Sequence, residues 1–320
     1  MSDDYKKTVR EVYAAAAMAP DRGLCCVPGS AWTMPDLLVP PVMHEMNYGC
    51  GSAVSPSDLG GKRPVVYVGV GGGLEALELA YFRRFPGGVI AVDPVAEMRE
   101  AAKRNLEEAA RLNPWFRPEF VRVLDGEADR LPVSDASADF VAQNCLFNVF
   151  TDDDLGAALG EVHRVLAPGG RFSTSDPITT APLPEALRRD DTLRARCISG
   201  CQTYENYLSR MEDAGFGQII VRARAPYRLL TPEEYPELET PILLESLEVL
   251  AVKTGSSSAA RVFTGRCAIY RGTGTSVRDG FAFAPGAPVP VSDEAATALA
   301  VDPDFLVTES TYHARCAGCC

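Results

Sequence analysis

Short apolar runs and amphipathic stretches alternate through the middle of the chain. The apolar run at 89–93 is typical of a buried strand, and 97–112 carries charges on one helical face and apolar residues on the other. Strands are predicted at 65–70, 89–93, 119–124, 139–145, 170–175 and 218–223, and helices at 74–85, 97–112, 152–166 and 204–214. These repeated strand–helix units predict an α/β fold built on a mostly parallel, doubly wound, Rossmann-like sheet.

The two flanks of the chain lack this alternation. Residues 1–60 open with a helical pattern and continue into a stretch broken by prolines and glycines, whereas the region after 226 mixes prolines with short β-like runs. We therefore expect three parts. They are an N-terminal helix and cysteine-containing loop segment over 1–60, the sheet domain over 61–225, and a small α+β domain over 226–320 that ends in a cysteine-rich tail.

Composition narrows the classes of partner. The chain has 320 residues, of which 46% are apolar, and a formal net charge of −12. An acidic protein lacks the basic face that nucleic acids and anionic membranes require, so we expect neither as a partner. The first residues carry no apolar stretch of the kind found in signal peptides, and no run approaches membrane length. The ten cysteines are accordingly expected to be reduced thiols in a cytoplasmic protein.

A glycine-rich turn marks a candidate cofactor site. Gly69, Gly71 and Gly73 follow a predicted strand and precede a helix, where glycine permits a tight turn and close approach of a ligand to the backbone. Asp93 ends the next strand, where a carboxylate can accept hydrogen bonds from both hydroxyls of a ribose. These features alone fit a nicotinamide dinucleotide as well as other adenosine-containing cofactors.

Later motifs favour one of these cofactors. The third strand leads into Asp125-Gly126-Glu127-Ala128, and the helix after the fourth strand closes in Leu166-Ala167-Pro168-Gly169-Gly170. This ordered set resembles the class I S-adenosylmethionine-dependent methyltransferases. The resemblance implies that S-adenosylmethionine is the cofactor and that ten residues bind it, namely Tyr48, Gly69, Gly71, Gly73, Asp93, Pro94, Gly126, Glu127, Ala128 and Asn144. One departure is Tyr67, which stands where that family usually has an acidic residue.

The cysteines lie beside glycines and turns, and not mainly at apolar core positions. Soft thiolates on loops suit a soft, thiophilic acceptor such as trivalent arsenic. The stretches that contain Cys25-Cys26, Tyr48-Gly49-Cys50-Gly51, Cys197-Ile198-Ser199-Gly200, Phe263-Thr264-Gly265-Arg266 and Cys319-Cys320 resemble arsenite methyltransferases, particularly the branch associated with arsenosugar biosynthesis.

This second resemblance implies the roles of the thiols. Cys50 and Cys197 would bind arsenic, and Cys267 or its rival Cys201 would be the third ligand. Four more cysteines are candidate accessory thiols: Cys25, Cys26, Cys319 and Cys320. The tail is either a thiol relay or a terminus without a role in turnover. The expected substrates are arsenite and methylarsenite, with glutathione or thioredoxin as reductant.

Two other functions remain open from the sequence. The chain could methylate an organic thiol or amine, with structural cysteines, and such an enzyme would need a general base near the acceptor. It could also be a thiol-rich arsenical-binding protein without catalysis, an alternative that the departure at Tyr67 keeps open. The three histidines are too few and scattered to suggest a histidine-based metal site.

Overall fold

The computed structural model describes residues 4–21, 24, 32, 34–255 and 260–310. Its helices are α1 (Asp4–Met18), α2 (Pro41–Glu45), α3 (Leu74–Phe82), α4 (Ala96–Leu112), α5 (Asp152–Val165), α6 (Glu185–Arg188), α7 (Asp191–Ala195), α8 (Tyr204–Asp213) and α9 (Asp293–Leu299). Its strands are β1 (Val65–Val68), β2 (Val89–Asp93), β3 (Val121–Asp125), β4 (Ala138–Asn144), β5 (Leu166–Thr179), β6 (Gln218–Leu230), β7 (Ile242–Val252), β8 (Arg261–Phe263), β9 (Cys267–Tyr270), β10 (Ser276–Arg278), β11 (Phe281–Phe283), β12 (Pro288–Pro290) and β13 (Phe305–Val307).

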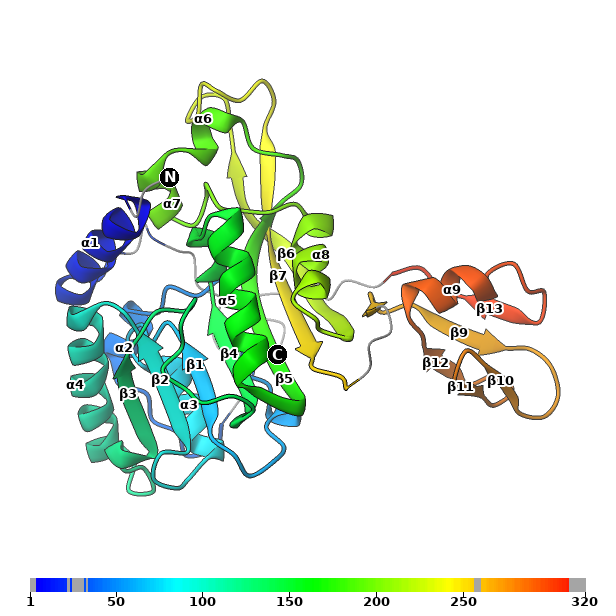
Figure 1. The fold of residues 1–320 in the computed structure, drawn as a ribbon, viewed down its shortest axis with the longest axis horizontal. Coiled ribbons are helices and arrows are strands. Elements are labelled where there is room, and N and C mark those ends of the chain that lie inside the picture. The colour runs from blue at the N-terminus through cyan, green and yellow to red at the C-terminus, as the bar shows by residue number, and fades with distance from the viewer. Residues whose placement is uncertain (1–3, 22–23, 25–31, 33, 256–259, 311–320) are drawn as a thin grey trace.

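An eight-stranded sheet in the order β3-β2-β1-β4-β5-β7-β6-β8 forms the centre of the molecule (Figure 1). The first five of these strands are parallel, and β7 runs antiparallel to both β5 and β6. The predicted α/β class and mostly parallel sheet are therefore confirmed. Strand order reverses beside β1, between β2 and β4, and such a switch point opens a crevice at the carboxyl ends of the strands.

Helices cover both faces of the sheet because its strands are apolar on both sides. In β1, Val65 and Tyr67 face the cluster that includes α3 and α4, whereas Val66 and Val68 face the cluster that includes α5 and α8. This two-sided burial explains the continuous apolar runs seen in the sequence. None of the helices in the described part of the chain combines the length and apolarity needed to cross a membrane.

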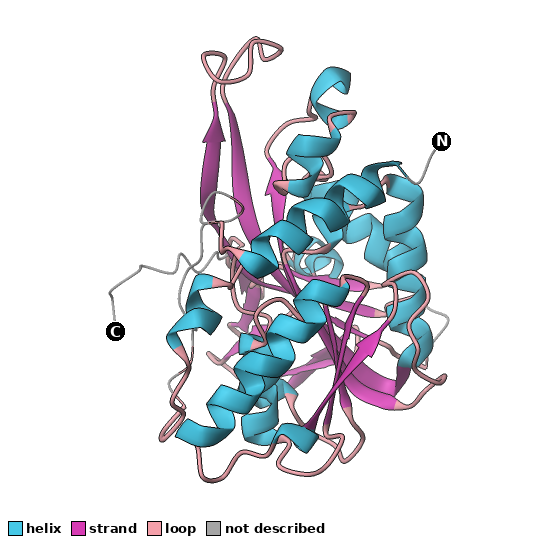
Figure 2. Ribbon diagram, turned by 90° about the vertical axis from the view of Figure 1, so that its left-hand side faces the viewer, coloured by secondary structure: helices cyan, strands magenta, loops and turns pink. Residues whose placement is uncertain are grey.

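The sheet continues past residue 226, where the sequence suggested a boundary. Strands β6 and β7 form a long antiparallel hairpin that extends beyond the parallel strands (Figures 1 and 2). Pro232 and Pro236 lie in its connecting loop, so the prolines mark a turn within the sheet. The separate α+β unit begins after β8, with β9 between β12 and β13, the β10–β11 hairpin and α9 around their own apolar cluster.

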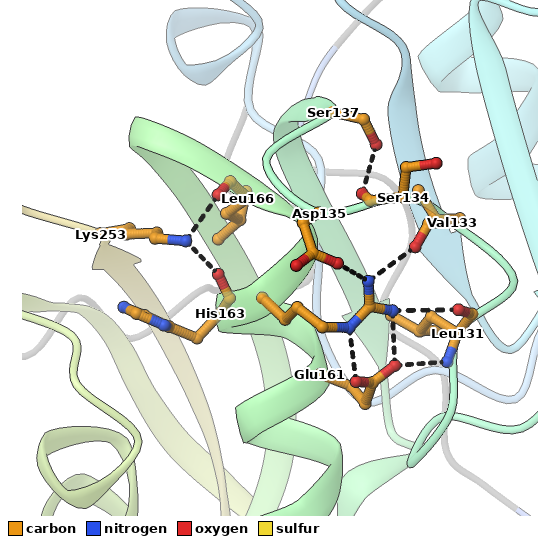
Figure 3. Close-up of polar contacts among 10 residues, drawn as sticks. Leu131, Val133, Ser134, Asp135, Ser137, Glu161, His163, Leu166 and Lys253 are labelled. Carbon is orange, nitrogen blue, oxygen red and sulfur yellow. Dashed lines mark hydrogen bonds and ion pairs between the residues drawn. The ribbon is translucent and has the colours of Figure 1, made fainter.

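A polar cluster fixes the connection between β3 and β4 to α5 (Figure 3). Arg164 binds the carboxylates of Glu161 and Asp135 and donates to the carbonyls of Val133 and Leu131. Lys253, directly after β7, donates to two carbonyls at the carboxyl end of α5, which helices otherwise leave without partners. The cluster thereby fixes the end of the loop between β3 and β4. The beginning of the same loop, Gly126 to Ala128, contributes to the site described below.

Candidate functional site

A cavity lies at the carboxyl ends of β1, β2 and β4, where the strand order reverses. Its walls come from the glycine turn after β1, the end of β2, the loop before β1, and α1. The lining residues are Val9, Arg10, Tyr13, Met46, Asn47, Tyr48, Gly49, Tyr67, Gly69, Gly71, Gly72, Leu74, Glu75, Asp93, Pro94, Val95, Met98, Asn144, Cys145 and Leu146. Segments far apart in the sequence thus meet at the place where open α/β sheets bind ligands.

The glycine turn leaves its side of the cavity open. Gly69 and Gly71 have φ values of 83° and 50°, in the left-handed region that side chains rarely adopt. A Cβ atom on Gly71 would meet nothing nearer than the carbonyl of Met46 at 3.8 Å, so a ligand can approach this backbone closely. The turn ends at Gly73, after which α3 begins.

Asp93 presents a buried carboxylate to the same cavity. Its two oxygens accept hydrogen bonds from the amides of Val70 and Val95 at 2.9 Å each. Each carboxylate oxygen has a second lone pair, which leaves acceptor capacity for ligand hydroxyls. Burial raises the pKa of Asp93 to about 6, so this carboxyl group is ionised at neutral pH.

A second lobe extends the cavity along the sheet edge. It is lined by Gly126, Glu127 and Ala128 after β3 and shares with the first lobe Val9, Arg10, Gly69, Pro94 and Leu146. Arg10 forms an ion pair with Glu127 across its mouth. The two lobes together line the sheet edge from the segment after β3 to the start of α3.

Asn144 connects the cavity to the loop that carries Cys50. Its side-chain oxygen accepts the amide of Cys50 at 3.0 Å, and its nitrogen donates to the carbonyl of Gly51 at 2.9 Å. A Cβ atom on Gly49 would lie 2.2 Å from the same side chain, so only glycine allows this packing. The thiol of Cys50 is buried, 3.6 Å from the hydroxyl of Ser175. Cys50 is therefore positioned by residues of the cavity wall.

Three more buried cysteines lie at this edge of the sheet. Cys145 follows β4 and lines the cavity, and Cys197 follows α7, with its sulfur 3.5 Å from the Cys145 carbonyl. Cys201 lies beside Cys197 and directs its sulfur to that residue's carbonyl at 3.3 Å. Cys145 and Cys197 both adopt positive φ, near 60°, a costly backbone conformation that clusters at functional sites.

The thiols are near one another without forming a closed chelate. In residues 4–21, 24, 32, 34–255 and 260–310, no three side chains of His, Cys, Asp or Glu are arranged to hold a metal ion. Burial, followed by the charge of Cys197, raises the pKa of the Cys201 thiol well above its ordinary value. Nearby Asp176 accepts hydrogen bonds from Thr174, Gln143 and Tyr207, and burial raises its pKa to about 7.

The structure brings together most of the residues predicted from the sequence, but not all. Tyr48, Gly69, Gly71, Asp93, Pro94 and Asn144 line the first lobe, and Gly126, Glu127 and Ala128 the second. Gly73 caps α3. Cys267 instead lies on β9 in the small α+β unit, which Figure 1 places at the opposite end of the molecule from α1. Cys25, Cys26, Cys319 and Cys320 lie outside the described residues.

Three features of the site were not found from the sequence. Helix α1 covers the cavity with Val9, Arg10 and Tyr13, because it packs against α4 and α7. Cys145, which ends the strand predicted at 139–145 and was not among the predicted site residues, lines the cavity. Glu75, in the helix predicted at 74–85, faces the cavity and is buried. A carboxylate two residues after the glycine turn was the signal for the last of these.

Comparison with known proteins agrees with this architecture. Residues 66–174 match the family model described as a methyltransferase domain. The chain is 30% identical to the arsenite methyltransferase of Halobacterium salinarum over 175 residues, which are 55% of this chain and 42% of that protein. It is 32% identical to the arsenite methyltransferase of Aquipseudomonas alcaligenes over 199 residues, 60% of this chain and 55% of that protein. The chain thus spans about half the length of these relatives.

A solved structure shares the fold over most of the chain. The crystal structure of an arsenic (III) S-adenosylmethionine methyltransferase from Chlamydomonas reinhardtii superposes with a TM-score of 0.58 at 21% identity, covering 87% of this chain and 95% of that one. The class I methyltransferase fold predicted from the sequence is confirmed. So is the resemblance to arsenite methyltransferases, which now extends from short motifs to aligned stretches of 175 and 199 residues.

Proposed function

We propose that this protein is an S-adenosylmethionine-dependent arsenite methyltransferase. One observation carries the proposal: the cavity at the glycine turn and the buried cysteines lie at the same edge of the sheet, joined by Asn144. The amide side chain contacts the Cys50 backbone on one side and the wall of the cavity on the other. Two arsenite methyltransferases align with this chain over about half of their length. Their named activity supports the proposal.

The residues of the cavity fit S-adenosylmethionine. When bound, this cofactor supplies a methyl group activated by a sulfonium. Gly126 to Ala128 would hold its adenine, the carboxylate of Asp93 would accept its ribose hydroxyls, and the open backbone at Gly71 would admit its amino-acid part. The pairing of Asp93 with two backbone amides pre-organises the carboxylate before the ligand arrives.

The buried thiols would hold the acceptor. Cys50 and Cys197, with Cys201 beside the latter, would displace hydroxide from arsenite and bind As(III) as a pyramid with an exposed lone pair. Alignment of that lone pair with the methyl carbon supplies most of the acceleration. The lone pair of the arsenic held by these thiols would form the As–C bond with the methyl group that the cofactor supplies, and the electron pair of the broken S–CH3 bond would leave with the cofactor sulfur. Arsenic needs no deprotonation, so no general base is required.

Turnover would also require a reductant. Methyl transfer formally oxidises arsenic by two electrons, and two thiolates can return those electrons by forming a disulfide. Glutathione or thioredoxin would then reopen the disulfide. Methylarsenite produced in this way could re-enter the site as a second substrate. The reaction would serve arsenic detoxification or arsenosugar biosynthesis.

Isotope-labelled methyl transfer tests this function. The protein is incubated with arsenite, glutathione and S-adenosylmethionine whose methyl group carries carbon-13, and arsenic species are separated and identified by mass spectrometry. We expect labelled methylarsenicals and one molecule of S-adenosylhomocysteine for each methyl group transferred. Production of S-adenosylhomocysteine with an organic thiol or amine, and none with arsenite, would contradict the proposal.

A further inference from the structure

A buried carboxylate in the cavity has no role in the reaction described above. Glu75 is the second residue of α3, directly after the glycine turn, and only 9% of its surface is exposed. Its side chain lines the first lobe of the cavity. Acidic residues are rarely buried to this extent unless a partner compensates their charge. The partners of Glu75 therefore indicate what the cavity holds.

The partners of Glu75 in the structure are neutral. Asn144 donates a hydrogen bond to its carboxylate oxygen at 2.9 Å, and the hydroxyl of Tyr67 donates a second one. Burial is the main cause that raises the pKa of Glu75, and these two hydrogen bonds oppose it. Tyr67 is itself buried in β1, and its pKa is raised by burial first and by Glu75 next. The pair thus forms a hydrogen-bonded unit on the wall of the cavity, with the tyrosine as donor.

Charges elsewhere in the cavity do not compensate this carboxylate. Among the described residues that line the first lobe, the basic side chain is Arg10, which is committed to Glu127 at the mouth of the second lobe. Asp93 adds a second carboxylate to the same lobe. The wall near α3 is therefore electronegative, and a cationic group of a ligand would recover the desolvation cost of Glu75.

We propose that Glu75 binds the α-ammonium group of S-adenosylmethionine, with the Tyr67 hydroxyl and the Asn144 amide orienting its carboxylate. This inference rests on the proposed cofactor. The assignment agrees with the order of the residues along the cavity. The lobe at Gly126 would take the flat end of the ligand, Asp93 the middle, and Glu75 the end nearest α3. The acidic group that β1 lacks at Tyr67 is thus supplied from the first turn of the next helix.

The same contacts link the ammonium site to the arsenic-binding loop. Asn144 donates to Glu75 and to the Gly51 carbonyl with one nitrogen, and accepts the Cys50 amide with its oxygen. A ligand ammonium at Glu75 therefore fixes a side chain that also positions Cys50. The carboxylate acts as a positioning group for the donor and, through Asn144, for the acceptor loop.

A pair of ligands and a pair of variants test the role of Glu75. The ligands are S-adenosylhomocysteine and its deamino analogue, in which hydrogen replaces the amino group, and affinity is measured by calorimetry. Glu75→Gln keeps the size of the side chain and one accepting oxygen but removes its charge. Glu78→Gln is the matched control, because Glu78 is a buried acid one turn later on α3 that is not among the residues lining the cavity.

We expect the wild type and Glu78→Gln to bind S-adenosylhomocysteine about tenfold or more tightly than the deamino analogue, the effect of one charge-assisted hydrogen bond. Glu75→Gln should lose most of this preference while binding the deamino analogue as the wild type does. A folded Glu75→Gln protein that keeps the full preference would overturn the assignment of Glu75 and leave the cofactor intact. A wild type that binds neither ligand would overturn the assignment together with the proposed cofactor.

Discussion

Asp93 combines a structural and a proposed binding role in one carboxylate. It fixes the backbone on both sides of the cavity by accepting the amides of Val70 and Val95, and it is positioned to accept the ribose hydroxyls of the cofactor. Burial keeps its pKa near 6, close enough to neutrality that moderate acidification protonates it. A protonated carboxyl group has fewer acceptor positions for hydroxyl groups.

Replacement of Asp93 by asparagine should weaken cofactor binding. An amide nitrogen cannot accept a hydroxyl, so we expect Asp93→Asn to cost about 1–2 kcal/mol of affinity for S-adenosylmethionine in calorimetry. The wild-type affinity should also fall as the pH is lowered through about 6, the pKa of this group. Asp125→Asn is the control, since Asp125 ends the neighbouring strand with a 74% exposed side chain. Equal affinities of Asp93→Asn and Asp125→Asn for S-adenosylmethionine would show that Asp93 does not contribute to cofactor binding.

Asp176 should make the stability of the protein depend on pH. Burial raises its folded-state pKa to about 7, above the value of about 3.9 for an unfolded aspartate. The folded state therefore holds a proton that the unfolded state has released, and the stabilisation is complete below about pH 4 and is lost as the pH rises through 7. The melting temperature of the wild type should fall between pH 5 and pH 8 by more than that of Asp176→Asn. Parallel curves in differential scanning calorimetry would argue against a buried, protonated Asp176.

The loop from Asn47 to Ser52 packs against Asn144 of β4 and is also held by hydrogen bonds to Ser246 and Glu248 of β7. Asn144 fills the space beside Gly49, where a Cβ atom would lie 2.2 Å from its amide nitrogen. The loop can therefore hold Cys50 at the cavity only if residue 49 has no side chain. The loop before β1 thus depends on its packing against β4, in the centre of the sheet.

Substitution of Gly49 by alanine should disrupt arsenic methylation at the level of this loop. The added methyl group would displace Asn144 from Cys50, so we expect at least a tenfold loss of methylation rate, in the range seen when a small misplacement affects a reactive group. Gly60→Ala is the control, because a Cβ atom there meets nothing within 4 Å. A Gly49→Ala enzyme with the rate of Gly60→Ala would show that Cys50 does not depend on this packing.

Elements with continuous apolar runs could be predicted from the sequence, whereas elements set by tertiary contacts could not. Strands β1, β2 and β4 were found because both of their faces are buried. The segment after Pro184 forms two short helices, α6 and α7, because Asp190 caps a new helix through the Leu193 amide. Strand β7 was missed because the mixture of prolines and apolar residues around it resembled a domain boundary. Its pairing with β5 and β6 joins residues that are distant in the sequence, so no local pattern reveals it.

At the scale of the whole molecule, the site assembles from parts that the sequence keeps far apart. The glycine turn, Asp93 and the segment after β3 were predictable because each follows a strand at the same edge of a parallel sheet. The distances among the cysteines were not, since they depend on how the loop before β1 and the segment after α7 fold over that edge. The structure places Cys197 and Cys201 at this edge and Cys267 on β9 in a separate unit.

Arsenic speciation of cysteine variants is the most direct test of this arrangement. Cys50→Ser, Cys197→Ser and Cys267→Ser proteins are incubated with arsenite, S-adenosylmethionine and glutathione, and products are measured by chromatography with elemental mass spectrometry. Serine keeps the size of the side chain but binds arsenic far less well than a thiolate. We predict that Cys50→Ser and Cys197→Ser lose methylated products while retaining cofactor affinity, and that Cys267→Ser resembles the wild type. Wild-type product formation by Cys50→Ser or Cys197→Ser would contradict the account.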